Sequence, residues 1–495
     1  MNDGRRIEWR VVVLLAVAAV ALRAQTFGNP VLGFDEQFYL VMADRMLHGA
    51  LPYVDIFDRK PIGLFLLYAG SRLLGGEGTI EYQAMAALFA FATALVIYRL
   101  STRIAPPSGA ILAALLYLVW LDFMGGEGGQ APVLFNLPMA IAALLTARAL
   151  ASGGRNLFGL GAGAMLATGL AIQIKYTVAF EGIFFGCTLL WTGRRAGLTP
   201  LRLVPHALGW VAIALAPTVA ALVTYVALGH GPEFVFANFA SIFGRLPDPL
   251  TVDLVGIAKI AAVLSPLLAL AALPPREADD NAALQRRFVQ IWLGVAIASM
   301  LAMRSFASSQ YGLPLLAPAV IAAAPRLGTK GWGRLAGWTI IVLGMAISQI
   351  ALTQQRIQKG GRAAALAVAA AAAPHRGCLY VYDGYPALYR LTHSCLLTRF
   401  IFPGHLNTAN EASIAALGVD PNAEVERIMK AGPETVVDDW PRYAGGNPAT
   451  HAILQGYLGR DYHLVLRFAT GHGRLRLVYR RNASAGPPAT MRAGK

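Results

Sequence analysis

The chain has 495 residues, of which 56% are hydrophobic and only 14% are charged. A soluble globular domain carries roughly 25% charged residues, so most of this surface does not face water. The formal net charge is +15, but Lys and Arg stand mostly at the ends of apolar runs and in the C-terminal region. No basic cluster is interleaved with aromatic residues, which excludes a nucleic-acid-binding surface. The composition predicts an integral membrane protein that is surrounded by membrane lipids.

Apolar runs recur from residue 11 to residue 352. The first run follows Arg5, Arg6 and Arg10, and it is interpreted as an uncleaved signal anchor because many further spans come after it. We predict an all-α polytopic bundle of about eleven transmembrane helices. The predicted spans lie near residues 11–27, 79–100, 109–124, 132–150, 157–173, 177–193, 207–228, 252–273, 288–303, 312–325 and 335–352.

The distribution of basic residues sets the predicted orientation. With the N-terminus in the cytoplasm, 16 Lys and Arg lie at inner ends and 9 at outer ends before residue 353. The odd number of spans then places the C-terminal region outside. Arg outnumbers Lys and Ala is abundant, which is typical of a GC-rich bacterial genome. We therefore predict the cytoplasmic (inner) membrane of a bacterium, with the C-terminal region periplasmic or extracellular.

The first outer loop, residues 28–78, holds most of the polar residues that suggest chemistry. Tyr39, Met42 and Met46 recur at helical spacing after Asp35, which predicts an amphipathic helix over 35–49 that lies on the membrane surface. The apolar stretch 61–74 is short for a span. We predict that it forms a helix that packs at the interface.

Two segments of this loop combine acids with bases, Gly33-Phe-Asp-Glu-Gln-Phe-Tyr39 and Leu51-Pro-Tyr-Val-Asp-Ile-Phe-Asp-Arg-Lys-Pro61. One interpretation is structural: Asp35 caps a helix, and the second segment is a solvated turn ended by proline. The other is functional: a carboxylate base faces a cationic phosphate site at the membrane surface. Spacing alone leaves both open. The candidate residues are Asp35, Glu36, Tyr39, Asp55, Asp58, Arg59 and Lys60.

Two more cations stand at predicted outer ends of spans. Lys175 lies between two apolar runs, and Arg304 precedes Ser308-Ser-Gln-Tyr311. Ionisable residues at membrane depth are functional candidates, whereas snorkelling to the headgroups is the ordinary alternative. The sequence has no phosphate-binding Gly-rich loop, no Ser/His/Asp order and no His/Cys metal spacing. This argues against an ATP-driven transporter.

The composition changes after residue 352. An Ala-rich helix over 363–373 and a later one over 423–430 accompany β-rich runs at 378–382, 435–437, 462–468 and 475–479. We predict a small extracytoplasmic α/β domain over 353–480, after a catalytic transmembrane domain over 1–352 and before a disordered tail over 481–495. An external compartment permits a disulfide between Cys378 and Cys395; two buried free thiols are the alternative.

These features together resemble the GT-C glycosyltransferases, in particular the dolichyl-phosphate-mannose–protein mannosyltransferase and bacterial aminoarabinose transferase group. Gly169 to Lys175 resembles the group's Gly-Leu-Ala-x-x-x-Lys stretch, and Gln310-Tyr311-x-x-Pro314 resembles its His-Tyr-x-x-Pro element. Two departures are Ile62, where the group usually has a second proline, and Gln310, where His is common. The first-loop residues that carry the resemblance are Asp35, Glu36, Tyr39, Ala43, Gly49, Pro52, Tyr53, Asp55, Asp58, Lys60 and Pro61.

The resemblance implies that a sugar moves from a polyprenyl-phosphate donor to a lipid, glycan or protein acceptor outside the cytoplasm, by one inverting displacement. Asp35 is then the base, Glu36 a positioning residue and Asp55 the alternative base. Lys60, Lys175 and Arg304 are expected to meet at the donor phosphate. No nucleotide or other cofactor is implied, and the sequence contains no decisive site for a divalent metal.

The main alternative is a multi-span transporter or flippase of lipid-linked saccharides. It predicts inverted repeats and ionisable residues at mid-membrane, but the sequence shows no convincing repeat, and its ionisable residues gather at one face. A non-catalytic scaffold with an external binding domain is a third possibility. It would tolerate the loss of Asp35.

Overall fold

The computed structural model describes residues 7–273, 280–303, 306, 308–470 and 473–483. The predicted site residue Arg304 and most of the predicted disordered tail lie outside the described residues. The described chain forms two compact units. The first comprises residues 1–27, 83–221 and 249–352, and the second comprises residues 28–82, 222–248 and 353–495.

Every predicted span overlaps a helix. Six helical stretches in the described residues, at 79–101, 131–151, 200–227, 250–272, 280–303 and 332–372, are long and apolar enough to cross a membrane. The number of crossings stays a prediction, because several of the other helices are shorter. The helices at the predicted spans are α1 (Trp9–Leu22), α4 (Thr79–Ser101), α5 (Pro107–Phe123), α6 (Ala131–Ala151), α7 (Leu157–Ile172), α8 (Ala179–Arg195), α9 (Pro200–Ala227), α11 (Leu250–Ala272), α12 (Asp280–Met303), α13 (Leu316–Leu327) and α14 (Trp332–Lys359).

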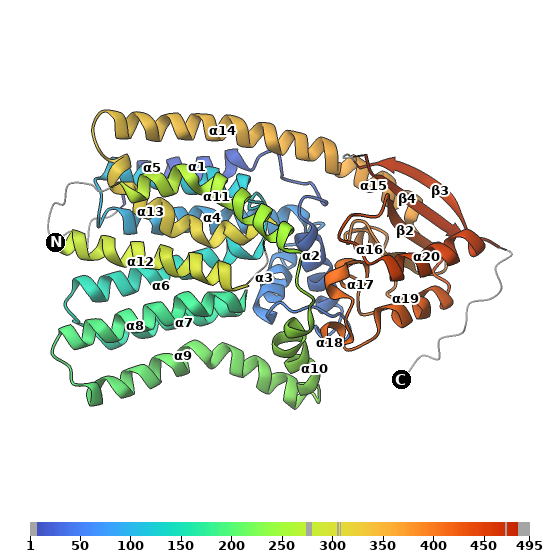
Figure 1. Ribbon diagram of the computed structural model, residues 1–495, viewed down its shortest axis with the longest axis horizontal. Helices are drawn as coiled ribbons and strands as arrows, with labels where there is room; N and C mark the ends of the chain where they lie inside the picture. The colour runs from blue at the N-terminus through green and yellow to red at the C-terminus, as the bar shows by residue number, and fades with distance from the viewer. Residues whose placement is uncertain (1–6, 274–279, 304–305, 307, 471–472, 484–495) are drawn as a thin grey trace. The chain divides into compact units, whose positions relative to one another are not determined.

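Helices of the first unit run side by side along one direction (Figure 1). Small residues let their backbones approach closely, as is common where helices pack in membranes. A Cβ on Gly109 of α5 would lie 2.3 Å from the Ala324 carbonyl oxygen of α13. A Cβ on Gly169 of α7 would lie 2.6 Å from the Ala214 carbonyl oxygen of α9. Larger side chains at these two positions would force the helices apart.

The first loop forms two helices of the second unit, α2 (Phe34–Leu47) and α3 (Ile62–Arg72). An α-helix rises about 1.5 Å per residue, so the 11 residues of α3 are too few to cross a bilayer, as predicted. The prediction of an amphipathic surface helix is wrong for α2, because every residue from Glu36 to Ala43 is buried. Its side chains pack against other parts of the same unit: Phe34 and Phe38 each lie 5.4 Å from Phe402, measured between ring centroids.

The C-terminal region contains the predicted small sheet together with helices. Its sheet has the order β1-β2-β4-β3, with β1 and β2 parallel and the other neighbours antiparallel. Every predicted strand is present. The strands are β1 (Leu379–Val381), β2 (Thr435–Trp440), β3 (Tyr462–Ala469) and β4 (Leu475–Arg481). The remaining helices are α10 (Gly231–Val235), α15 (Arg362–Ala372), α16 (Leu388–Leu391), α17 (Gly404–Asn407), α18 (Ile414–Leu417), α19 (Pro421–Lys430) and α20 (Pro448–Asp461).

Helices α15 and α20 cover opposite faces of the sheet (Figure 1). Successive strand residues point to opposite faces: Thr435 of β2 donates to the Ala372 carbonyl at the end of α15, whereas Asp438 accepts from His451 of α20. Cys378 and Cys395 form a disulfide with their Cα atoms 5.1 Å apart. The bridge joins the start of β1 to the segment after α16, which confirms the predicted proximity.

Candidate active site

Helix α2 begins directly before the acidic pair of the first loop. Its N-cap is Gly33, so Asp35 is the second helical residue, and its interpretation as a helix cap is wrong. Glu36 is 1% exposed and folds back over the N-cap: a Cβ on Gly33 would lie 2.7 Å from Glu36 Oε1. Its carboxyl group therefore packs against the backbone at the start of the helix. Glu36 is thus buried at the helix start, whereas its neighbour Asp35 is half-exposed.

Three tyrosines pack beside this acidic pair. The ring centroid of Tyr68 lies 5.5 Å from that of Tyr39 and 5.2 Å from that of Tyr82. Burial raises the pKa of the Tyr68 phenol well above its usual value, and the negative charges of Glu36 and Asp35 raise it further. The phenol is therefore protonated. Sequence reasoning missed Tyr68 and Tyr82. The available signal was a tyrosine, with its polar hydroxyl, inside each apolar run.

Lys60 stands on a turn whose backbone is held on both sides. Its N–H donates to Asp58 Oδ1 at 2.8 Å, and its carbonyl accepts from the Tyr53 hydroxyl at 2.8 Å. Asp58 is 6% exposed, so its carboxylate serves the turn. Lys60 Nζ lies 5.7 Å from the ring centroid of Tyr39. Tyr39 thus touches both Tyr68, beside the acidic pair, and the predicted phosphate-binding lysine.

Arg59 is held by a carboxylate. Its guanidinium donates to both oxygens of Glu411, at 2.8 and 2.7 Å, and also to Ser241 and the Ala416 carbonyl. Glu411 also pairs with Arg245 at 2.8 Å. Sequence reasoning missed Glu411, because no pattern links it to a loop 352 residues earlier. The geometry gives Arg59 an anchoring role.

Asp55 lies elsewhere in the second unit. Its Oδ2 accepts from the Leu51 N–H at 2.7 Å, which closes a turn, and the residue is exposed. It lines a groove of about 420 Å³. Asp55 and Arg399 both line this groove. Near it, a backbone hydrogen bond of 2.9 Å from the Phe57 N–H to the Arg399 carbonyl joins the first loop to the C-terminal domain. The other lining residues are Leu396, Leu397, Thr398, Phe400, Val419, Glu424 and Arg427.

Within the first unit, the structure brings together two sequence candidates. Lys175 follows α7, and its Nζ lies 4.6 Å from the ring centroid of Tyr311. Tyr311 and Gln310 stand in a 3-10 turn over Ser309–Leu315, directly before α13. The Gly-Leu-Ala-x-x-x-Lys and Gln-Tyr-x-x-Pro elements, far apart in sequence, therefore meet in space.

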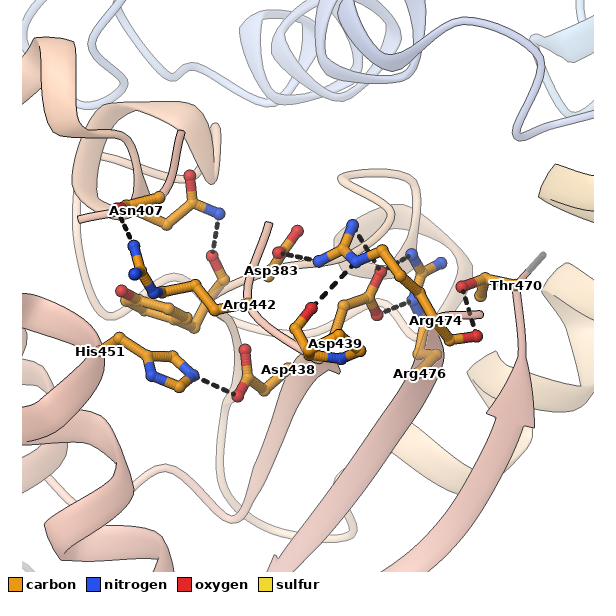
Figure 2. Close-up of polar contacts among 12 residues, drawn as sticks. Asp383, Asn407, Asp438, Asp439, Arg442, His451, Thr470, Arg474 and Arg476 are labelled. Atoms are coloured by element: carbon orange, nitrogen blue, oxygen red, sulfur yellow. Dashed lines mark hydrogen bonds and ion pairs between the residues drawn. The ribbon is translucent and has the colours of Figure 1, made fainter. Parts of the chain in front are cut away.

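A second polar cluster, which sequence reasoning missed, lies in the C-terminal domain. Asp383 follows β1 and Asp439 is near the end of β2, so both stand at the carboxyl ends of the parallel pair (Figure 2). Arg476 donates to both oxygens of Asp439 at 2.7 Å, and Arg474 pairs with Asp383 at 2.8 Å. These pairs tie β4 to the ends of β1 and β2. Among the described residues, no three His, Cys, Asp or Glu side chains are grouped as metal ligands.

Residues 58–223 match the family model described as dolichyl-phosphate-mannose-protein mannosyltransferase. This range includes Lys60, Tyr68 and Lys175. No curated protein matches the chain significantly in sequence.

Solved structures share the fold over nearly the whole chain. ArnT from Cupriavidus metallidurans bound to undecaprenyl phosphate is 15% identical, with a TM-score of 0.61 over 98% of this chain and 100% of that one. Its apo form is 17% identical, with a TM-score of 0.61 over 97% and 99%. The oligosaccharyltransferase of Archaeoglobus fulgidus is 13% identical, with a TM-score of 0.50 over 97% of this chain and 75% of that one. The chain therefore has the GT-C membrane fold that its first loop indicated, with the mannosyltransferase family pattern over residues 58–223.

Proposed function

We propose that the chain transfers a sugar from a polyprenyl-phosphate donor to an acceptor hydroxyl on the extracytoplasmic side of a bacterial inner membrane. The observation that carries the proposal is the cluster in the second unit: two carboxylates act on the protonated Tyr68, and Lys60 lies over the ring of Tyr39, which packs against Tyr68. The likeness to a fold that binds undecaprenyl phosphate in ArnT supports this choice of donor.

In the proposed reaction, Asp35 removes the proton of the acceptor hydroxyl as the oxygen attacks the anomeric carbon. The bond between that carbon and the phosphate oxygen breaks, and its electron pair leaves with the polyprenyl phosphate. One displacement inverts the anomeric configuration. Lys60 is the proposed cation of the second unit for the phosphate, whose charge grows as the bond breaks, and Lys175 stays the second cation that the sequence predicts. The proposal includes Arg304 as a third cation.

The acceptor class is lipid, glycan or protein, and the sugar is a hexose or a pentose. The proposal needs no nucleotide. A transfer assay with purified protein and a labelled undecaprenyl-phosphate sugar tests it, and a parallel assay with a chelator separates metal-dependent from metal-independent transfer. Movement of the intact lipid-linked sugar between leaflets, without transfer, would instead favour a flippase.

The decisive variant is Asp35→Asn. Asn keeps the size of the side chain but cannot take a proton, and residue 35 is not the cap of α2. We expect a loss of transfer of at least about a hundredfold, since positioned proton transfer contributes roughly 10² to 10⁴. Donor binding and melting temperature should stay at wild-type values. Transfer at a near wild-type rate would move the base to Asp55, and Asp55→Asn is the matched variant.

A further inference from the structure

We propose that Glu411, in the C-terminal domain, is a positioning residue that holds Lys60 in its donor-binding geometry. The inference rests on the proposed function and adds a residue that no sequence pattern indicated. Glu411 acts through Arg59, the residue directly before Lys60 in the chain. It belongs to the same compact unit as both.

The carboxylate joins three separate segments. Arg59 comes from the first loop, Arg245 follows the 3-10 turn over Ser241–Gly244, and Glu411 precedes α18. Both oxygens of Glu411 accept from Arg59, and Oε1 also meets Arg245 Nε at 2.8 Å. The backbone of the segment before Arg245 directly contacts the segment after Glu411, because a Cβ on Gly244 would lie 2.2 Å from the Ala415 carbonyl carbon. The three segments are thus fixed to one another at a single ion cluster.

The Arg59–Glu411 ion pair is largely buried, which raises the free-energy cost of breaking it. The Arg59 and Glu411 side chains are 13% and 8% exposed. Arg59 makes four hydrogen bonds in this environment. Removing one partner of a buried pair leaves an uncompensated charge, which is strongly destabilising. Without the carboxylate, the Arg59 guanidinium keeps only its bonds to Ser241 and the Ala416 carbonyl, so the turn that carries Lys60 is held less firmly.

Local charge makes Glu411 more than a structural contact. Arg59, Lys60 and Arg245 are all close enough to lower the pKa of the buried His405 side chain, after the larger effect of burial. Glu411 is the carboxylate that bonds both arginines in this group. It compensates part of the positive charge and fixes two cations in place. Lys60 remains oriented beside Tyr39, where it is available for an anionic phosphate.

The test measures binding of undecaprenyl phosphate to the full-length protein in detergent micelles, together with the donor KM, kcat and melting temperature. Glu411→Gln keeps the shape of the side chain and removes the charge. Asp439→Asn is the matched control, because Asp439 also accepts two hydrogen bonds from a buried arginine, Arg476, within the C-terminal domain. We expect Glu411→Gln to weaken binding and raise KM about tenfold, and the control to stay within about twofold; tenfold corresponds to about 1.4 kcal/mol.

Unchanged binding by folded Glu411→Gln would overturn the inference, and so would equal losses in both variants. A fall in melting temperature without a change in affinity would assign Glu411 a purely structural role. If Glu411→Gln does not fold, the same measurements are made on Arg245→Gln. This variant removes one of the two arginines that pair with Glu411 and leaves the pair with Arg59. We expect it to weaken binding about threefold, and unchanged affinity would again overturn the inference. If wild-type protein binds no undecaprenyl phosphate, the proposed function fails together with this inference.

Discussion

At the scale of single residues, the second unit places ionisable groups in surroundings that change what they can do. Tyr68 is protonated beside two carboxylates, whereas His405 is kept neutral among three cations. The sequence marks neither residue, because each takes its properties from neighbours that arrive from elsewhere in the chain. Phenylalanine is a useful replacement for both residues, because it keeps an aromatic side chain at the position and removes the polar atoms.

We expect Tyr68→Phe to lower kcat about tenfold, the effect of losing roughly 1.4 kcal/mol in the transition state. The hydroxyl lies close enough to Glu36 and Asp35 for their charges to raise its pKa, so its removal changes the surroundings of the proposed base. The stacked ring remains, and melting temperature should change little. Steady-state kinetics at several pH values check this. A wild-type kcat with an unshifted pH profile would remove Tyr68 from the site.

Because His405 is buried beside cations, we expect the folded protein to lose stability as the pH falls. Burial lowers the pKa of its imidazole well below the ordinary value of 6.5, and the charges of Arg59, Lys60 and Arg245 lower it further. The unfolded chain therefore binds a proton near pH 6.5 that the folded protein does not. Stability is fully present above that pH, is lost progressively as the pH falls below it, and levels off under the folded pKa.

The measurement is the melting temperature of wild type and His405→Phe between pH 8 and pH 5. The variant cannot titrate at this position, and its ring suits the neighbouring Phe57 and Phe402, whose centroids lie 5.1 and 5.2 Å from that of His405. We expect the wild-type melting temperature to fall more steeply below pH 6.5. Parallel profiles for the two proteins would contradict the prediction.

At the scale of elements, the disulfide and the buried ion pairs hold the C-terminal sheet together. Cys378 and Cys395 close a loop with a sequence separation of 17 residues. In the chain-entropy account, closing a 15-residue loop stabilises a fold by about 3 kcal/mol. We expect the double variant Cys378→Ser, Cys395→Ser to lower the stability of this domain by a similar amount. A guanidinium titration followed by proteolysis of the domain measures the change.

Addition of a reductant provides the control for the disulfide. It should shift the unfolding of wild type toward that of the double variant, and it should leave the variant itself unchanged. An unfolding midpoint that is equal in both proteins, with and without reductant, would show that the bridge contributes nothing to stability.

At the scale of the whole molecule, the topology remains a prediction, and it decides where the site operates. The charge bias and the predicted odd number of spans place the C-terminal domain outside, and its disulfide is the kind of bond that persists in oxidising compartments. Alkaline phosphatase fused after residue 361 should therefore be active. A fusion after residue 196, between α8 and α9, should be inactive. The reverse pattern would place the first loop in the cytoplasm and overturn the proposed site.

The sequence by itself determined the long apolar helices, the strands and the chemical character of the first loop. Long apolar runs have few alternatives to helix in a bilayer, and short β-rich runs after residue 352 predicted each strand. The acidic pair and Lys60 were visible because acids and bases are rare in this composition. The disulfide partners could be named because they stand close together in the chain, on either side of one short helix.

Only the tertiary structure decided what the first loop packs against. Helix α2 is buried because the loop joins the C-terminal domain in one compact unit, where Phe402 covers Phe34 and Phe38. Glu411, Tyr68 and His405 became site candidates for the same reason: contacts between distant segments bring them to the loop. Periodicity records which face of an element is apolar, but it carries no information about which distant residue will cover that face.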